Sequence, residues 1–190
     1  APDYTEAWYC MARIYSQMTT KAKLPPVEGH RLAAEAADKA LQYNPDFAPA
    51  HALLGFMLSL FDLNFTAAAK HYQRALALAP TNLEIIGGAA SMASCLGRLD
   101  TAIALLEYAN ARDPLNAANH SHLGFLYRCA GRCEDAVASY NLALRLSPGI
   151  MSAHYNIGAA RMLNGEPDEA FKAILLEEEE GYRLMGLAPI

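Results

Sequence analysis

A period of about 34 residues runs through this chain and limits its fold more than any single motif does. Four prolines follow this period closely: Pro45, Pro80, Pro114 and Pro148. Three glycines also recur with it, and an acidic residue comes three positions after each of them: Gly97, Gly131 and Gly165. Glycine favours the C-terminal cap of a helix, and an acidic side chain favours the start of the next one. The period therefore predicts a repeated unit of helix A, a tight turn, helix B and a proline break.

Small residues recur at two positions when the units are aligned. One position in helix A, the eighth of the unit, carries Ala12, Gly55, Ala90, Gly124 and Gly158. One position in helix B, the twentieth, is alanine in all five units: Ala33, Ala68, Ala102, Ala136 and Ala170. Two antiparallel helices can approach closely only where a side chain is small, so these positions predict the line of contact within each pair. A large side chain at Gly124 should overpack that contact.

The unit between Pro114 and Pro148 carries the most complete pattern. It reads HSHLGFLY at 120–127, followed by Ala136, Tyr140 and Ala143. This resembles the tetratricopeptide repeat (TPR), whose pattern is W-x2-L-G-x2-Y, then A-x3-F, then A, then P. The resemblance covers nearly the whole chain. It implies an all-α fold, a right-handed superhelix of antiparallel helix pairs in which stacked units build one continuous core.

The expected domain organisation is a single TPR array over residues 1–190. The units fall at about 5–45, 46–80, 81–114, 115–148 and 149–180, followed by a truncated helix at 181–190. The first unit exceeds the period by nine residues, which predicts a longer loop between helices A and B near 18–30. The second unit has one extra residue near FDLNF, 61–65, in place of the glycine turn.

Those departures, and the ending LEEEEGYRLMGLA, resemble TPR segments of large bacterial multidomain regulators. In such proteins the repeats follow a nucleotide cyclase domain or a winged-helix DNA-binding domain. The resemblance implies that the segment belongs to a protein with such a domain arrangement. It implies no activity of the segment itself. Because the chain starts without methionine and ends in mid-pattern, we expect it to be a piece of a longer protein.

Composition excludes several classes of function. Apolar residues make up 53% of the chain and charged residues 18%, which is typical of a folded domain. The net charge of −5 gives no electrostatic reason to bind nucleic acid or an anionic membrane surface. No segment reaches the roughly 20 apolar residues that span a bilayer. Four cysteines do not make a disulfide framework and leave the redox compartment open, and a cytoplasmic location is favoured.

The stretch HSHLGFLYRCAGRC, 120–133, has the residue types of a zinc site but not the spacing. His120 and Cys129 are nine residues apart, about 13 Å along a helix, whereas zinc needs ligands at about 2.0–2.3 Å from one ion. We therefore predict no metal and no cofactor, and a disulfide between Cys129 and Cys133 stays an open alternative. His51, His120 and His154 share the fourth position with Trp8 and Ile86, which predicts packing, with pH sensing as the alternative.

The sequence contains no nucleophile elbow, phosphate-binding loop or paired-carboxylate motif, so we predict that this segment is not an enzyme. The run EEEE at 177–180 is predicted to be a solvated helix end.

The second, fifth, ninth and twelfth positions of helix A share a second face, which lines the concave groove in TPR arrays. The candidate partner-binding residues on this face are Tyr9, Arg13, Phe56, Ser91, Ser121, Phe125, Arg128, Tyr155 and Met162.

Aromatic and methionine side chains beside two arginines suit a protein or peptide partner with apolar anchors and an acidic contact. The predicted function is a non-enzymatic protein–protein interaction scaffold that binds a peptide or helix segment in the groove. The alternative is self-association, giving a homo-oligomer, or an intramolecular regulatory module of a larger bacterial signalling or transcription protein. The carboxylate clamp of chaperone-binding TPR domains is not expected, because only Arg13 and Arg128 are basic on this face.

Overall fold

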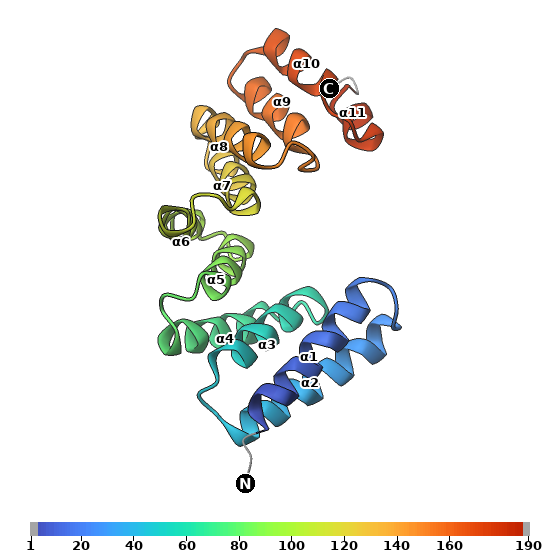
Figure 1. Cartoon of the computed structure of the whole chain (residues 1–190). Coiled ribbons are helices and arrows are strands. Elements are labelled where there is room, and N and C mark those ends of the chain that lie inside the picture. The colour runs from blue at the N-terminus through green and yellow to red at the C-terminus, as the bar shows by residue number, and fades with distance from the viewer. Residues whose placement is uncertain (1–3, 188–190) are drawn as a thin grey trace. The chain divides into compact units, whose positions relative to one another are not determined.

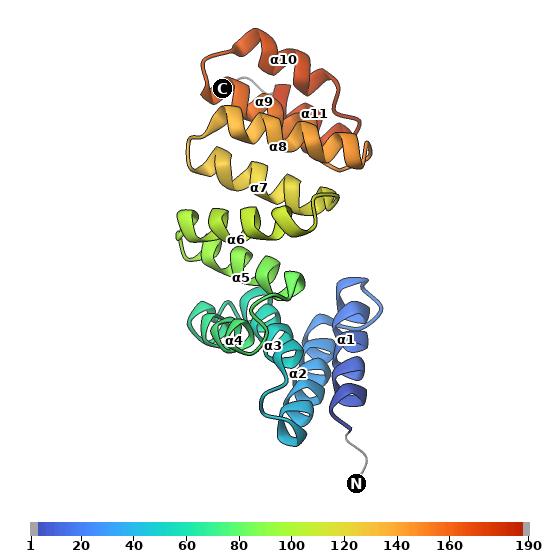
Figure 2. The ribbon, with the colours of Figure 1, turned by 60° about the vertical axis from the view of Figure 1, so that its left-hand side comes forward.

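The computed structural model describes residues 4–187, and in this range it contains eleven α-helices and no strand (Figures 1 and 2). The helices are α1 (Thr5–Thr20), α2 (Pro26–Tyr43), α3 (Ala48–Leu60), α4 (Phe65–Leu78), α5 (Leu83–Cys95), α6 (Leu99–Arg112), α7 (Ala117–Cys129), α8 (Cys133–Leu146), α9 (Ala153–Leu163), α10 (Pro167–Leu175) and α11 (Glu180–Leu187). None of these helices combines the length and the apolar character needed to cross a membrane. The chain forms two compact units that divide between Gly97 and Arg98.

Each unit is built from antiparallel helix pairs. In the first unit α1 packs on α2 and α3 on α4, with α5 against α4. In the second unit α7 packs on α8 and α9 on α10, with α6 against α7 and α11 against both α9 and α10. The predicted all-α fold of paired helices is therefore confirmed.

The small positions lie where the helices of a pair approach most closely. A Cβ atom added to Gly124 of α7 would lie 2.9 Å from the Cδ2 atom of Tyr140 in α8, and one added to Gly55 would lie 2.9 Å from the Cδ2 atom of Tyr72. At Gly158 the added atom would lie 2.4 Å from Cγ1 of Ile174. The alanines of both positions have no exposed surface at all: Ala12, Ala33, Ala68, Ala90, Ala102, Ala136 and Ala170. The predicted line of contact is confirmed for the pairs α3–α4, α7–α8 and α9–α10.

A large side chain of helix B lies against each of these glycines, and Leu106 holds the equivalent position in α6. We call these side chains the wedge residues, and they recur with the period of the repeat: Tyr72, Leu106, Tyr140 and Ile174. All four are buried, with exposed fractions of 7%, 0%, 1% and 4%. Burial raises the pKa of the Tyr140 hydroxyl to about 12, so its ring is a neutral packing group.

The turns between helices A and B use a left-handed residue. Gly97, Gly131 and Gly165 have φ angles of 71°, 75° and 79°, as expected for glycine at a helix C-terminus. In the second pair Leu63 takes this conformation, with φ at 51°, and its side chain is 67% exposed. The side chain of Asn64 then accepts a hydrogen bond from the Ala67 amide at 3.1 Å and caps α4. The FDLNF turn thus replaces glycine with a left-handed leucine followed by a capping asparagine.

The predicted longer loop near 18–30 is only the connection 21–25, and most of the extra residues of the first pair lengthen its helices. The helices α1 and α2 have 16 and 18 residues, and only 21–25 connect them. The added turns pack on each other, because a Cβ atom on Gly29 would lie 1.8 Å from the Oγ1 atom of Thr19. Glycine at position 29 therefore lets the end of α1 lie directly on the start of α2.

The run EEEE at 177–180 is solvated only in part, which corrects the prediction. Glu178, Glu179 and Glu180 are exposed, but Glu177 is buried. A carboxylate oxygen of Glu177 accepts a hydrogen bond from the Tyr155 amide, at 3.0 Å, in the first turn of α9. The residue at the N-cap, Ser152, makes no side-chain cap, so Glu177 supplies the negative charge that the helix start favours.

We predict that Gly124→Leu lowers the free energy of unfolding by about 3 kcal/mol, because the new side chain must displace the Tyr140 ring. The matched control is Gly87→Leu, another glycine inside a helix, where an added Cβ meets no atom within 4 Å. This control should be neutral or stabilising, since leucine has the higher helix propensity. Denaturant unfolding of both variants measures the difference, and equal effects would contradict the packing role of Gly124.

Candidate functional site

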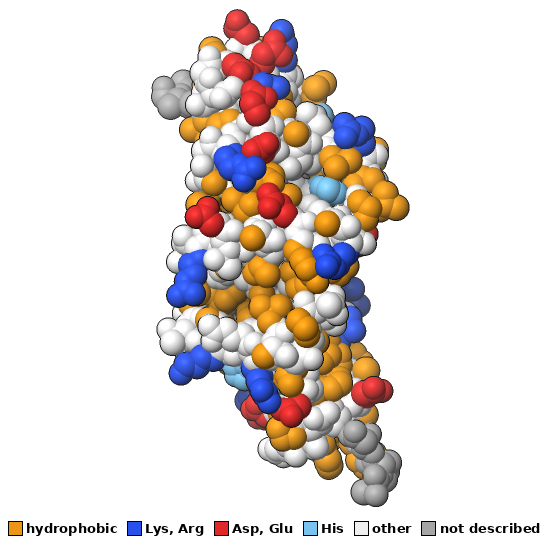
Figure 3. Space-filling model, turned by 90° about the vertical axis from the view of Figure 1, so that its left-hand side faces the viewer, with side chains coloured by type: hydrophobic (Ala, Val, Ile, Leu, Met, Phe, Trp, Pro, Cys, Tyr) orange, Lys and Arg blue, Asp and Glu red, His pale blue; other side chains and the backbone are white. Residues whose placement is uncertain are grey.

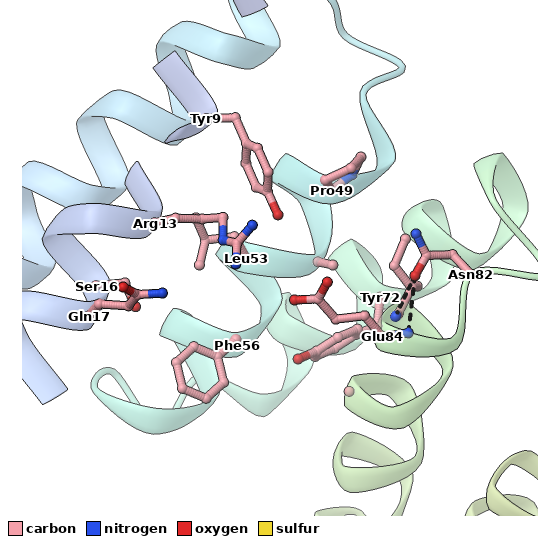
Figure 4. A pocket seen from close by; sticks show the side chains of 13 residues that line it. Tyr9, Arg13, Ser16, Gln17, Pro49, Leu53, Phe56, Tyr72, Asn82 and Glu84 are labelled. Carbon is pink, nitrogen blue, oxygen red and sulfur yellow. Dashed lines mark hydrogen bonds between the residues drawn. The ribbon is translucent and has the colours of Figure 1, made fainter. Parts of the chain in front are cut away.

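A pocket of about 340 Å³ lies in the first unit between α1, α3, α4 and α5 (Figure 4). Three of the predicted partner-binding residues line it together, namely Tyr9, Arg13 and Phe56. The remaining lining residues are Ser16, Gln17, Pro49, Ala52, Leu53, Tyr72, Asn82, Glu84, Ile85 and Gly88. Helices distant in sequence thus contribute to one hollow in this unit.

The α1 wall combines an aromatic ring with a cation. The guanidinium carbon of Arg13 lies 5.8 Å from the centre of the Tyr9 ring, and the same ring meets Phe47 edge-on at 5.4 Å. Burial, and then the nearby Glu84 carboxylate, raise the pKa of Tyr9, while Arg13 opposes this shift. Tyr9 is therefore a neutral hydroxyl group at physiological pH, held by the Phe47 ring and the Arg13 guanidinium and able to donate or accept a hydrogen bond.

Opposite charges face each other across the pocket. Figure 4 shows Arg13 of α1 and Glu84 of α5 directed into the hollow from opposite walls. Neither side chain forms an ion pair with another described residue. Both are exposed, so each can exchange water for a charged group of a ligand.

The floor of the pocket is fixed by packing. The Tyr72 ring lies between Gly55 and Gly88, where an added Cβ would come within 2.9 Å and 2.6 Å of it. The side-chain oxygen of Asn82 accepts hydrogen bonds from the backbone amides of Glu84 and Ile85, at 3.0 and 3.2 Å. This cap sets the first turn of α5 and with it the position of Glu84.

A second pocket, of about 300 Å³, lies in the second unit among α7, α9, α10 and α11. It contains three more of the predicted residues: Arg128, Tyr155 and Met162. The last three predicted residues line neither pocket. Ser91 donates a hydrogen bond to the Gly87 carbonyl of its own helix at 3.2 Å, Ser121 is half-buried, and Phe125 is 40% exposed beneath Arg128.

Glu84 and Pro49 were missed in the prediction from sequence, although the signal was present. Both occupy the second position of their units, on the same helical face as the predicted residues. Tyr72 and Asn82 could not be found in this way, because one is a wedge residue of helix B and the other lies before its helix. Their approach to the pocket depends on tertiary packing.

Two of the three histidines at the fourth position, His51 and His120, hydrogen-bond to the carbonyl of the proline six residues earlier. Nε2 of His120 donates to the Pro114 carbonyl at 3.0 Å, and His51 does the same to Pro45 at 3.0 Å. The side-chain amide of Asn110 lies 3.2 Å from Nδ1 of His120, so both ring nitrogens of this buried histidine are hydrogen-bonded. The predicted packing role is confirmed for His120, and the structure adds its hydrogen-bonding role.

The HSHLGFLYRCAGRC stretch does not converge on one point. Among residues 4–187, no three His, Cys, Asp or Glu side chains gather in a way that could hold a metal ion. All four cysteines are free thiols, including exposed Cys129 and buried Cys133, so the disulfide alternative is not realised in this structure.

Figure 3 shows one face of the molecule, on which hydrophobic side chains and charges of both signs are interspersed. No large area of this face carries charges of one sign alone. Binding through long-range electrostatic attraction would need such a field, so the face shown is better suited to local contacts.

Comparison with known proteins gives the fold. No protein-family model and no curated protein matches the chain. Solved structures do match, at TM-scores of 0.79 for PilW, a widely conserved type IV pilus biogenesis factor, 0.72 for YrrB, a TPR protein with an unusual peptide-binding site, and 0.68 for MamA. Identities are 18%, 18% and 23%, over 97%, 94% and 91% of this chain and 84%, 89% and 94% of theirs. The chain therefore has the TPR-type α–α superhelix fold class, as predicted.

A histidine pair in the first unit should make stability depend on pH. Nδ1 of His71 in α4 lies 3.1 Å from Nδ1 of His51 in α3, a contact that requires one of the two nitrogens to be unprotonated. Burial, and then His51, lower the pKa of His71, while Asp38 opposes this. Since the unfolded chain then binds the proton more readily, the free energy of unfolding should fall as pH drops below about 6.5.

Denaturant unfolding at pH 7.5 and 5.5 measures this loss. His71→Gln should make it smaller, since glutamine can still hydrogen-bond to His51 but does not titrate. Part of the pH dependence of stability should remain in this variant, because burial also lowers the pKa of His122 in the second unit. If His71→Gln retains the whole pH dependence of the natural chain, the histidine pair is not its source.

Proposed function

We propose that the chain is a non-enzymatic interaction scaffold that binds a peptide or helical segment of a partner protein in a concave groove lined by the second, fifth, ninth and twelfth positions of its A helices. The pocket that brings Tyr9, Arg13 and Phe56 together is the observation that carries the proposal. Phe56 is 38% exposed at its rim, which makes it available as an apolar contact.

The chemistry of the pocket suits a peptide. Its volume, about 340 Å³, is at the small end for ligand sites, so it accommodates a few side chains and not a large cofactor. Tyr9 and Phe56 offer aromatic contacts of the kind that dominate protein interfaces. Arg13 and Glu84 can each pair with an opposite charge, which favours a segment with an apolar residue between an acidic and a basic one. The structurally similar YrrB, with its peptide-binding site, supports the same kind of ligand.

The test is to select peptides from a random displayed library against the whole chain and to measure their affinity by calorimetry. We expect Phe56→Ala to weaken a selected peptide by about tenfold or more, as for a central interface residue. Arg13→Glu should weaken peptides that carry an acidic residue more than those that lack one.

The matched control is Ile14→Ala, which removes an apolar side chain that is 54% exposed on the same helix but does not line the pocket. It should leave the affinity unchanged. Selected peptides that bind the natural chain and the Phe56→Ala variant equally well would reject this pocket as the binding site.

A second candidate function is self-association, or docking of another part of a larger bacterial regulator. The last two helices favour it, because their apolar side chains are more than half exposed: Phe171, Leu175, Leu184 and Met185. Light scattering as a function of concentration tests it, with an expected rise above the 20.6 kDa of one chain. Leu184→Glu should suppress that rise. A mass that stays at one chain throughout would reject self-association.

A further inference from the structure

The second-unit pocket differs from the first in its charge. We call it the Arg128 pocket and define it by Arg128 of α7, Tyr155 and Met162 of α9, Ile174 of α10, and Met185 and Gly186 of α11. Among the described residues that line it, Arg128 alone is charged. The first-unit pocket, in contrast, has both an arginine and a glutamate.

The floor of the Arg128 pocket is a packed wedge residue. Ile174 is 4% exposed and lies between two glycines, where an added Cβ would come within 2.4 Å of it at Gly158 and 2.8 Å at Gly186. The rim is formed by flexible apolar side chains: Met162, Leu163 and Met185 are 40%, 65% and 59% exposed. Methionine side chains adapt to ligands of different shape, so a rigid floor and an adaptable rim suit an inserted apolar side chain.

Arg128 has no anionic partner in the described part of the chain. Its neighbours are neutral groups: its charge lowers the pKa of the nearby Tyr140 hydroxyl, and its guanidinium lies 5.5 Å from the centre of the Phe125 ring. Its buried Nε atom has no hydrogen-bond partner among the described residues. Neighbouring arginines are satisfied differently, since Arg132 pairs with Asp135 at 2.8 Å and Arg161 with Glu166 at 2.6 Å. A half-buried guanidinium that lacks an acid is electrostatically incomplete, and an incoming carboxylate would complete it.

We propose that the Arg128 pocket is a separate binding site for an acidic peptide. An aromatic or branched apolar side chain of the peptide enters between Met162 and Met185, and the carboxylate of an adjacent Asp or Glu pairs with Arg128. A peptide with lysine at that place is repelled by the guanidinium. At about 300 Å³ the pocket accepts one or two side chains, which favours a peptide over a long acyl chain.

The probe is the blocked peptide acetyl-Gly-Phe-Glu-Gly-amide, compared with its Gln and Lys counterparts at the Glu position. The whole chain is labelled with ¹³C in the methionine methyl groups, and the signals are followed by NMR during titration. The Met162 and Met185 signals should shift with the Glu peptide, while that of Met57, buried in the first unit, should not. We expect the Gln peptide to bind about tenfold more weakly and the Lys peptide more weakly still.

Two variants identify the role of the charge. Arg128→Gln should remove the preference for Glu over Gln, while Arg128→Lys should keep part of it. Arg112 also lies on an aromatic ring, 3.3 Å from the centre of Tyr108. The control variant Arg112→Gln should leave the affinities for the Glu and Gln peptides unchanged.

Equal binding of the Glu and Gln peptides, or a preference that survives Arg128→Gln, would overturn the proposal. So would decanoate shifting the Met162 and Met185 signals while the peptides do not, because the pocket would then be a site for an acyl chain. Phe56→Ala should leave this titration unchanged, so failure of the first-unit site and failure of the Arg128 pocket are distinguishable.

Discussion

The contact between a small residue of helix A and a wedge residue of helix B decides how the rest of each unit is arranged. At Gly55 and Gly124 a tyrosine ring lies on the helix backbone itself, because no Cβ separates them. Burying such a side chain contributes about 1.5–3 kcal/mol, and it also fixes how helix A is rotated about its axis. The opposite face must then point outward, and this is how Arg13 and Phe56 come to be exposed.

The parts of the structure that were predicted from sequence are those that obey a local rule repeated in every unit. A glycine turn, a small residue at the helix contact and a helical periodicity of 3.6 each leave a regular trace in the sequence. These rules predicted the fold class, the buried line at Gly124 and three residues of the first-unit pocket. The same periodicity places Glu84 at the second position of that face, but the residues of this position were not included among the candidates.

The parts that could not be predicted depend on contacts between segments that have no common pattern. Glu177 looks like one of four equivalent glutamates, and only its approach to the start of α9 makes it a buried cap. The lengths of α1 and α2 depend on Thr19 fitting against Gly29, a pair that occurs once in the chain. The hydrogen bond from His120 to the Pro114 carbonyl could not be predicted from sequence either, because other units have tryptophan or isoleucine at the same position.

The wedge residues also restrict the lengths of the insertions and deletions that such a chain can accept. Tyr72, Leu106, Tyr140 and Ile174 are evenly spaced by one period, whereas the extra residues of the first two pairs are taken up outside that series. A module can therefore be duplicated or excised in steps of one whole period, and every remaining wedge residue keeps its register with a glycine or alanine. An insertion of any other length has to be absorbed in a turn, as at Leu63, or in a helix extension, as in α1 and α2.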